Sequence, residues 1–275
     1  MGAFRNKLKI IHRKIDSIVG SLFGRHTLLR YSPQKSTHKF NFDNFNQYSY
    51  SKLSHFTQFN TLSIYNKQTP STCDLKVYQD LFIYNFIIDN IPKGSKILEI
   101  GGGDSRIVSC LKNEYEFWNL DKLEGEGYGP KLNFNTYGYY LIQDYIGSFS
   151  KQLPENFFDF VFSVSVIEHF PEDAKSINNI ILDFQRILKK NAISLHCVDS
   201  LLFNDHLWVH PIIFNLKSEF INGNFETNFE VIKNDRDLWT LSKYAYYTRW
   251  FPITLKKMDE FGQPFSLNIY WKNIS

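Results

Sequence analysis

Residues 96–104 constrain the fold of this chain more than any other stretch, and they read Lys-Ile-Leu-Glu-Ile-Gly-Gly-Gly-Asp. The apolar run at 97–100 is typical of a buried strand. The three glycines that follow allow a tight turn and a close approach of the backbone to a bound molecule. The residues from Arg106 onward predict a helix whose free N–H groups face the same place. The pattern therefore predicts a strand, a turn and a helix around a nucleotide-like ligand.

Strands and helices alternate through the rest of the chain. Strands are expected at 96–100, 115–120, 139–143, 158–164, 192–198, 239–247 and 266–271. Helices are expected from a capping pair at Ser71 and Asp74, after the glycines, and from Pro171 to Lys190, before Asn191 in a left-handed conformation. This alternation predicts a doubly wound, mostly parallel α/β sheet with helices on both faces.

Acidic residues lie at the ends of five expected strands. They are Glu99, Asp121, Asp144, Glu168 and Asp199. Core packing does not require acids at these positions. Ligands of doubly wound sheets bind beyond the carboxyl ends of the strands, so we expect these acids to face a ligand.

The charge around the glycines distinguishes two kinds of ligand. A dinucleotide would use an acid about 20 residues after the first glycine, and Asp121 fits that spacing. However, Arg106 stands where the third glycine of the dinucleotide motif is expected, and Glu99 and Asp104 would repel a pyrophosphate. S-adenosylmethionine has no phosphate, and its ammonium and sulfonium groups would be attracted by those acids.

Residues 98–105 resemble the first motif of class I S-adenosylmethionine-dependent methyltransferases, E/D-x-G-x-G-x-G, with Ser105 in place of the last glycine. Residues 158–163 and 166–169 are similar to the fourth-strand motif of that family, F-D-x-V followed by E-H. Residues 184–190 are similar to its next helix. The resemblance covers roughly residues 75–200. It implies a seven-stranded Rossmann-like fold, S-adenosylmethionine as cofactor and S-adenosylhomocysteine as product.

The resemblance also implies a set of cofactor-binding residues: Glu99, Gly101, Gly103, Asp104, Asp121, Asp144 and Ser163. In that family the acid matching Asp121 binds the ribose, and the residue matching Asp144 meets the adenine amino group. Either acid could instead be a loop acid or a helix cap. Asp159 lies at the start of its strand, away from the site, and we expect it to be structural.

The candidate catalytic residues are His169, Asp199 and His206, because a hydroxyl acceptor benefits from a base with a pKa near neutrality. Asp199, Asp205 and His206 are similar to a pattern in uncharacterised methyltransferases of bacterial glycan gene sets. They could form a base with its orienting carboxylate, bind Mg²⁺ or Mn²⁺, or be structural. The prediction is a base without a metal. His196 is expected in the core.

The favoured function is transfer of a methyl group from S-adenosylmethionine to a hydroxyl of a glycan or a small polar metabolite. The chain has Ser-Val-Ser-Val at 163–166, where DNA amino-methylating enzymes need D/N-P-P-Y/F, and the region after residue 120 is not basic. Nucleic acid is therefore not expected as a partner. The alternatives are a non-catalytic partner protein that binds S-adenosylmethionine and an NAD-dependent oxidoreductase.

The first 40 residues carry nine Lys/Arg and one acid, whereas the remainder has a net charge of −5. Apolar residues spaced by three and four over residues 4–22 predict an amphipathic helix. It could pack on the domain or on a second copy, or lie on an anionic membrane; nucleic acid is the least favoured partner. The expected domains are an N-terminal extension (1–60) and the methyltransferase domain (61–275), whose acceptor lobe is mainly 200–265.

Cysteine usage bears on the compartment of the protein. The three cysteines are far apart and match no metal-binding spacing, which is typical of reduced thiols in a cytosolic protein. No apolar stretch reaches the length of a membrane span. We therefore expect a cytoplasmic protein, with peripheral contact at the inner membrane surface if the basic helix binds lipid.

Overall fold

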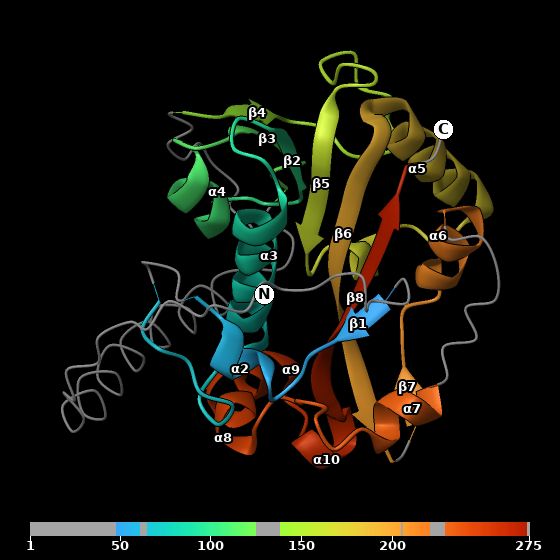
Figure 1. The fold of residues 1–275 in the computed structure, drawn as a ribbon. Coiled ribbons are helices and arrows are strands. Elements are labelled where there is room, and N and C mark those ends of the chain that lie inside the picture. Colours follow the sequence, from blue (N-terminus) through green and yellow to red (C-terminus); the bar gives the residue numbers. More distant parts are fainter. Residues whose placement is uncertain (1–47, 61–64, 125–137, 205, 221–228, 274–275) are drawn as a thin grey trace, which may run out of the picture. The chain divides into compact units, whose positions relative to one another are not determined.

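A computed structural model describes residues 48–60, 65–124, 138–204, 206–220 and 229–273 (Figure 1). The chain divides by its contacts into residues 1–35 and residues 36–275. All the features below belong to the second unit. The predicted helix over residues 4–22, the glycine-rich stretch 125–130 and Asp205 lie outside the described residues.

The centre of the fold is an eight-stranded sheet in the order β1-β8-β6-β5-β2-β3-β4, with β7 paired to β6. The strands are β1 (Tyr48–Tyr50), β2 (Lys96–Ile100), β3 (Glu116–Leu120), β4 (Tyr140–Ile142), β5 (Phe158–Val164), β6 (Leu188–Phe203), β7 (His206–Trp208) and β8 (Gln263–Lys272). Strands β2 to β6 pair in parallel, whereas β8 runs antiparallel to β6 and β1. The predicted doubly wound, mostly parallel sheet is confirmed, with short strands added at β1 and β7.

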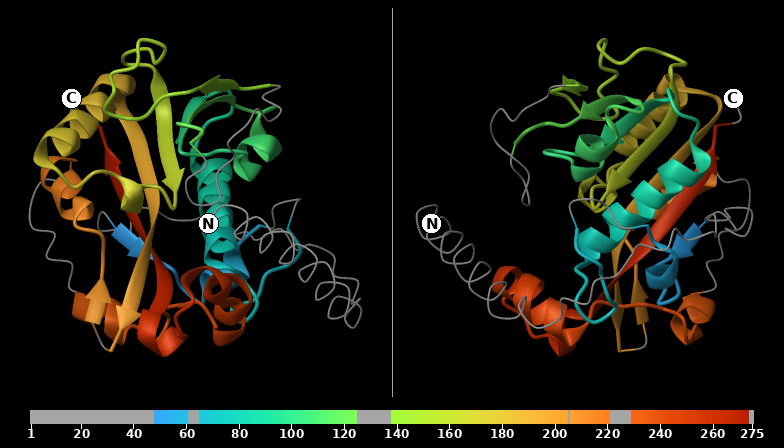
Figure 2. Two further views of the ribbon diagram at one scale, coloured as in Figure 1. Left: turned by 180° about the vertical axis from the view of Figure 1, so that it is seen from behind. Right: turned by 60° about the vertical axis from the view of Figure 1, so that its left-hand side comes forward.

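Helices cover both faces of this sheet (Figure 2). The longer ones are α3 (Leu75–Asn90), α4 (Arg106–Leu111), α5 (Ala174–Ile187) and α6 (Ile212–Phe220). The shorter ones are α2 (His55–Gln58), the 3₁₀ turn η2 (Ile167–His169), α7 (Phe229–Asn234), α8 (Lys243–Ala245), the π-helical turn η3 (Tyr246–Trp250), α9 (Phe251–Thr254) and α10 (Met258–Phe261). None of the described helices combines the length and hydrophobicity that a membrane span needs.

Two hydrophobic cores follow from the alternation of side chains along the strands. Ile97 packs with α3 and α4, whereas its neighbour Leu98 packs with α5 on the opposite face. Phe160 and Phe162 of β5 join the first core, and Val161 joins the second. Residues at the ends of the parallel strands are thereby fixed between two packed layers.

The expected strand at 239–247 is wrong, because residues 239–242 belong to no strand and residues 243–247 form α8 and the start of η3. The Ser242 hydroxyl accepts the Ala245 N–H and caps the helix. Ala245 and Tyr246 are buried together, while Tyr244 and Tyr247 are exposed. Two adjacent buried residues, flanked by exposed residues three positions apart, are typical of a helix and not of a strand. The aromatic composition of the segment concealed this spacing.

Several other element boundaries differ from those expected. Asp74, and not Ser71, caps α3, and Asn191 has a φ of 64° inside β6 rather than after a helix. β1 lies before residue 60, where the domain boundary was expected, and its residues pair with β8. Asp159 accepts the Lys96 N–H at 2.8 Å and pairs with Lys189 at 2.6 Å, as expected for a structural residue.

His196 is part of the core. Its side chain is fully buried, with Nδ1 2.8 Å from the Ser163 hydroxyl and Nε2 2.8 Å from the Ser194 hydroxyl. The ring stacks on Trp271 at 4.8 Å. Burial lowers the pKa of His196 to about 3. The imidazole therefore stays neutral in the folded protein.

Replacing His196 with alanine should lower the free energy of unfolding by about 3 kcal/mol, because it leaves a cavity and two unpaired hydroxyls. The ordinary histidine pKa of 6.5, which applies in the unfolded chain, lies above the pKa of His196 in the folded protein. His196 thus contributes stability above pH 6.5 that is lost as the pH falls toward 3. Urea denaturation across this window should show a shallower decline for the variant. His206→Ala, an exposed control, should change stability by no more than about 0.5 kcal/mol; equal effects of the two changes would contradict the core role.

Candidate functional site

The glycine turn joins β2 to α4 at the carboxyl edge of the sheet. Gly101 and Gly103 adopt φ values of 66° and 52°, a left-handed conformation that favours glycine. The Gly101 N–H donates to the Leu120 carbonyl at 2.7 Å, which ties the turn to the end of β3. Ser105 caps α4 by accepting the Val108 N–H. The turn is therefore a fixed backbone surface.

Two side chains from the end of β3 hold this turn. The Asn119 amide donates to the Gly103 carbonyl at 2.8 Å, and its oxygen accepts the Gly102 N–H at 3.2 Å. Asp121 accepts the Gly103 N–H at 2.8 Å and the Leu123 N–H at 2.7 Å. Asn119 was not predicted. The signal in the sequence was a buried amide inside an otherwise apolar strand.

Glu99 lies directly beneath the turn. A Cβ at Gly102 would be 2.5 Å from the Glu99 carboxyl carbon and 2.7 Å from its Oε2, so any larger residue there would displace the Glu99 carboxyl. The side chain is 4% exposed, and Oε2 has no hydrogen-bond partner among the described residues. Burial raises the pKa of Glu99 to about 7, against the lowering effects of a Ser105 hydrogen bond and of Lys76. A buried acid with a free oxygen is poised to accept a cation or an N–H donor.

The other predicted cofactor residues lie along the same edge, with one exception. Asp104 is exposed on the turn. Asp144 follows β4, the strand next to β3, and its carboxylate accepts the Tyr145 N–H at 2.9 Å. Burial raises the pKa of Asp144, but hydrogen bonds to its carboxylate, the first from the Tyr145 N–H, outweigh it and leave the pKa below its usual value. The exception is the Ser163 side chain, which points into the core and bonds to His196.

A second acidic feature lies where β5 and β6 end. Asp199 Oδ1 is 2.8 Å from the Gln79 amide nitrogen and 2.9 Å from the Ser165 hydroxyl. Glu168 Oε1 accepts the Asp199 N–H at 3.4 Å, and its Oε2 is buried without a partner in the described part of the chain. Burial raises the pKa of both carboxyls, and the Asp199 charge raises that of Glu168 further. The protonation of one carboxyl therefore depends on the charge of the other.

A cavity of about 230 Å³ opens beside this pair. Its lining residues are Glu168, His169, Asp199, Leu201, Trp208, Trp250 and Phe261. Two predicted catalytic residues, His169 and Asp199, are thus brought together. His206 is not, because it pairs with Phe203, four residues beyond Asp199 and roughly 13 Å along the strand. The structure therefore brings Asp199, Glu168 and His169 together and places His206 apart from them, while the catalytic role of Asp199 and His206 stays a prediction.

Helix α3 supplies polar groups to both acidic features, which the sequence reasoning missed. Gln79 contacts Asp199, and Lys76 donates to the Val164 carbonyl at 2.5 Å. Asp80 forms an ion pair with Arg106 at 2.6 Å. Positions 76, 79 and 80 share one side of the helix. The sequence did contain a signal for this contact, namely three polar residues with helical spacing in a helix that is otherwise mostly apolar.

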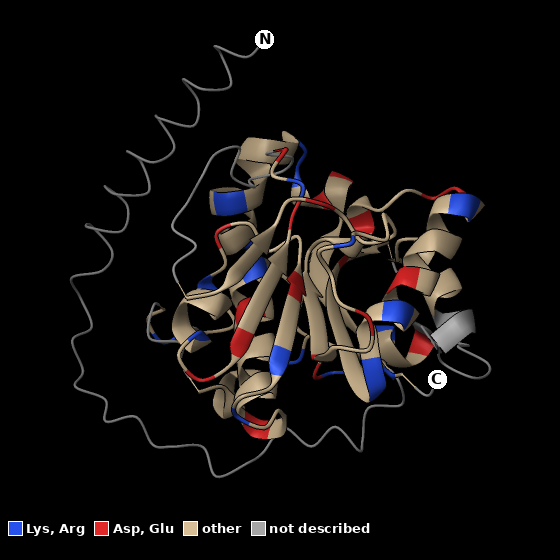
Figure 3. Ribbon diagram, turned by 90° about the horizontal axis from the view of Figure 1, so that it is seen from above, with Lys and Arg blue, Asp and Glu red and all other residues tan. Residues whose placement is uncertain are grey.

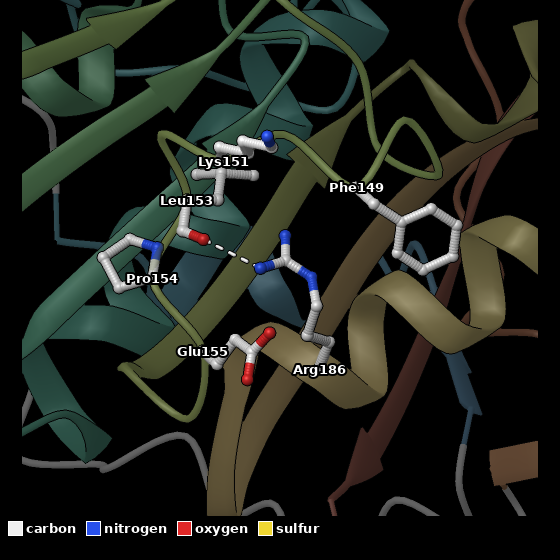
Figure 4. Close-up of a pocket in the computed structure, with 6 residues that line it drawn as sticks. All are labelled: Phe149, Lys151, Leu153, Pro154, Glu155 and Arg186. Carbon is white, nitrogen blue, oxygen red and sulfur yellow. Dashed lines mark hydrogen bonds between the residues drawn. The ribbon is translucent and has the colours of Figure 1, made fainter.

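A larger hollow of about 500 Å³ lies at the opposite edge of the sheet, before β5 and at the end of α5 (Figure 4). Its charged lining residues are Lys151, Glu155 and Arg186, and Arg186 is already engaged by Asp183 and by the Leu153 and Ser150 carbonyls. The Arg186 guanidinium is therefore already bonded within the protein. The carboxyl edge of the sheet is the better candidate for a ligand site.

The charges of the described region do not gather on one element. Basic and acidic residues are interspersed over its helices and strands (Figure 3). No group of three or more His, Cys, Asp or Glu side chains within the described ranges is arranged to hold a metal ion.

No family model and no curated protein matches this sequence. Among solved structures, the chain is similar to phosphoethanolamine N-methyltransferase 2 from Haemonchus contortus in complex with S-adenosyl-L-methionine (15% identity, 70% of this chain and 52% of that chain, TM-score 0.44). It is also similar to a TehB-like S-adenosylmethionine-dependent methyltransferase from Corynebacterium glutamicum (16% identity, 68% and 85%, TM-score 0.36). A third is an N-methyltransferase from Bradyrhizobium japonicum (12% identity, 66% and 86%, TM-score 0.37).

The chain spans about half the length of the Haemonchus enzyme. The three identities do not exceed 16%, and the three TM-scores are below 0.5. The assignment of the fold therefore rests on the sheet order and on the position of the glycine turn in this chain.

Proposed function

We propose that this protein is a methyltransferase that uses S-adenosylmethionine to methylate a hydroxyl of a glycan or a small polar molecule. The observation that carries the proposal is the buried Glu99 carboxylate beneath Gly102, with one oxygen free. This acid would repel a pyrophosphate and attract an ammonium group. The glycine turn above it leaves room for a ligand to approach the backbone.

The residues present fit S-adenosylmethionine. Glu99 would bind the ammonium end, Asp121 the ribose hydroxyls and Asp144 the adenine amino group. Asp121 and Asp144 follow adjacent strands, and the Asp121 N–H donates to the Ile142 carbonyl at 3.0 Å. These acids therefore form a row at one edge, in the order of the three polar parts of the ligand. When bound, the cofactor would supply an electrophilic methyl group on a sulfonium.

The pair of Glu168 and Asp199 supplies the base for the acceptor. Burial raises the pKa of both carboxyls, which makes their ionised forms stronger bases than a carboxylate with an ordinary pKa. Glu168 and Asp199 would take the hydroxyl proton of an acceptor held in the cavity, and S-adenosylmethionine, when bound, would supply the electrophilic methyl group to its oxygen. Trp208 and Trp250 line the same cavity, and their faces suit the apolar face of a sugar ring.

Glu168→Gln should lower kcat by about 100-fold or more while leaving the Kd for S-adenosylhomocysteine within about threefold, because the amide cannot accept the proton. Release of S-adenosylhomocysteine would be measured with panels of sugars and of amines as acceptors. Glu155→Gln makes the same charge change at the opposite edge and should keep full activity. Turnover by Glu168→Gln at the wild-type rate would remove the base role, and turnover with amines alone would overturn the hydroxyl assignment.

A further inference from the structure

The segment 243–257, which comprises α8, η3, α9 and the turn after it, has two different faces. Its inner face carries Tyr246, which is buried, and Trp250, whose indole N–H donates to Asp74 at 3.1 Å. Trp250 also contacts Phe261 at a ring distance of 5.9 Å and lines the acceptor cavity. The inner face is therefore fully used by the fold. On the outer face, the Tyr247 hydroxyl accepts the Met258 N–H at 3.5 Å, but the Tyr247 side chain is 43% exposed.

The outer face is apolar and exposed. It consists of Tyr244, Tyr247, Phe251, Ile253 and Leu255, with exposed fractions between 36% and 77%. These are five of the fourteen large hydrophobic residues that are exposed in the described part of the chain, and they fall within twelve positions. Tyr247 and Phe251 are neighbours, with ring centroids 5.5 Å apart. Scattered exposed apolar residues are ordinary, but a cluster of this kind marks a contact surface.

Leu255 is the most exposed residue of this face, at 77%, and it has a φ of 56°. Leucine adopts this left-handed conformation at a cost that asparagine or glycine would largely avoid. Neither burial nor backbone geometry accounts for a leucine at this tip. A contact with an apolar environment outside the chain would account for it.

Charge indicates what that environment is. Lys243, Arg249, Lys256 and Lys257 are all exposed within the segment. No acid occurs between Asp237 and Asp259. Surfaces that bind the membrane interface combine aromatic side chains with lysine and arginine. Their rings and aliphatic chains enter the headgroup region, and their cations contact anionic lipid. Every charge within 243–257 is positive, and the next exposed acids, Asp259 and Glu260, lie on α10 beyond the segment.

We propose that the outer face of residues 243–257 docks on an anionic lipid surface. Trp250 belongs to the same segment and lines the cavity, so the docked protein would hold that cavity close to the headgroups. An acceptor attached to a lipid would reach it from the membrane. This contact is separate from the predicted helix over residues 4–22 and does not depend on the identity of the cofactor.

Sedimentation of the full chain with vesicles tests the proposal. The protein should bind vesicles of phosphatidylcholine with phosphatidylglycerol, and bind vesicles of phosphatidylcholine alone more weakly. Lys256→Gln with Lys257→Gln should weaken binding to the anionic vesicles by about fivefold for each lysine. Ile253→Ser with Leu255→Asn should weaken it by about tenfold or more. Asparagine tolerates the conformation of Leu255, so this variant should keep its melting temperature.

Two matched controls keep the test specific. Val231→Ser removes an equally exposed apolar residue elsewhere, and Lys175→Gln removes an exposed cation from α5; both should bind vesicles like the wild type. Equal binding by all variants, or no binding by the wild type, would overturn the proposal. Self-association of the wild type that the Ile253 and Leu255 changes abolish would also overturn it and assign the face to a second copy. Affinity for S-adenosylhomocysteine without vesicles should be unchanged in every variant.

Discussion

Replacing Glu99 with glutamine should weaken the binding of S-adenosylmethionine by about 30-fold and, in the same protein, raise stability above neutral pH. The loss follows because a charge-assisted hydrogen bond to the ammonium group is worth about 2 kcal/mol. The gain follows because the wild-type carboxylate is buried with one oxygen free. Glutamine keeps the shape beneath Gly102 and carries no charge to bury.

The pH dependence of this gain has a definite sign. Burial raises the pKa of Glu99 to about 7 from an ordinary 4.5, so the folded protein binds the proton more tightly than the unfolded chain does. Stability from this group is present below pH 4.5 and is lost as the pH rises to 7, by about 3 kcal/mol in all. Glu99→Gln should remove that decline in urea denaturation from pH 5 to pH 8. Glu155→Gln should leave it unchanged, and a decline that persists in Glu99→Gln would contradict the burial account.

Asp121→Ala should lower affinity for S-adenosylhomocysteine by about 100-fold, the second large effect. The change would remove the proposed partner of the ribose hydroxyls, a charged hydrogen-bond acceptor. It would also release the Gly103 and Leu123 N–H groups, which Asp121 holds at 2.8 and 2.7 Å. Isothermal calorimetry would measure the affinity, with melting temperature recorded beside it.

Adenosine separates the two acids in the same experiment. It keeps the ribose and lacks the amino-acid tail, so Asp121→Ala should weaken adenosine and S-adenosylhomocysteine alike. Glu99→Gln should weaken only S-adenosylhomocysteine. Asp159→Ala is the matched control, because Asp159 also accepts a backbone N–H but lies at the start of β5. Unchanged affinity in Asp121→Ala would remove the ribose assignment.

The part of the site that follows β2 could be predicted from the sequence because its information is local. The apolar strand, the three glycines and Glu99 are consecutive, and the geometry of a strand and turn places them in contact. Asp121 could be placed for a similar reason, since parallel strands end at one edge. The clamp by Asn119 was a local signal as well, but an amide inside a strand has many ordinary explanations.

The acceptor side depended on contacts between distant residues. Gln79 meets Asp199 across 120 positions, and Glu168 meets it across 31. His206 is near Asp199 in sequence, yet β6 continues past Asp199 and carries His206 away on β7. Nothing in the local pattern at Asp199 shows that the strand would extend to Phe203, since its antiparallel partner β8 lies some 60 residues later.

The aromatic segment at 239–247 shows a different limit. Tyrosine and tryptophan favour strands in general, and the aromatic composition of the segment concealed the helical spacing of its buried residues. The segment is nevertheless helical, because Ser242 caps it and Ala245 and Tyr246 are buried on one side. The same turn then positions Trp250 over the cavity, so the error in secondary structure also hid one wall of the proposed acceptor site.

Calorimetric titration of the wild-type protein with S-adenosylmethionine, S-adenosylhomocysteine and NAD, at pH 6 and at pH 8, tests the central claim most directly. The two sulfur ligands should bind at one site per chain, and more tightly at pH 8, where Glu99 is ionised. NAD should not bind, because its pyrophosphate would meet Glu99 and Asp104. Binding of NAD without binding of either sulfur ligand would contradict the account.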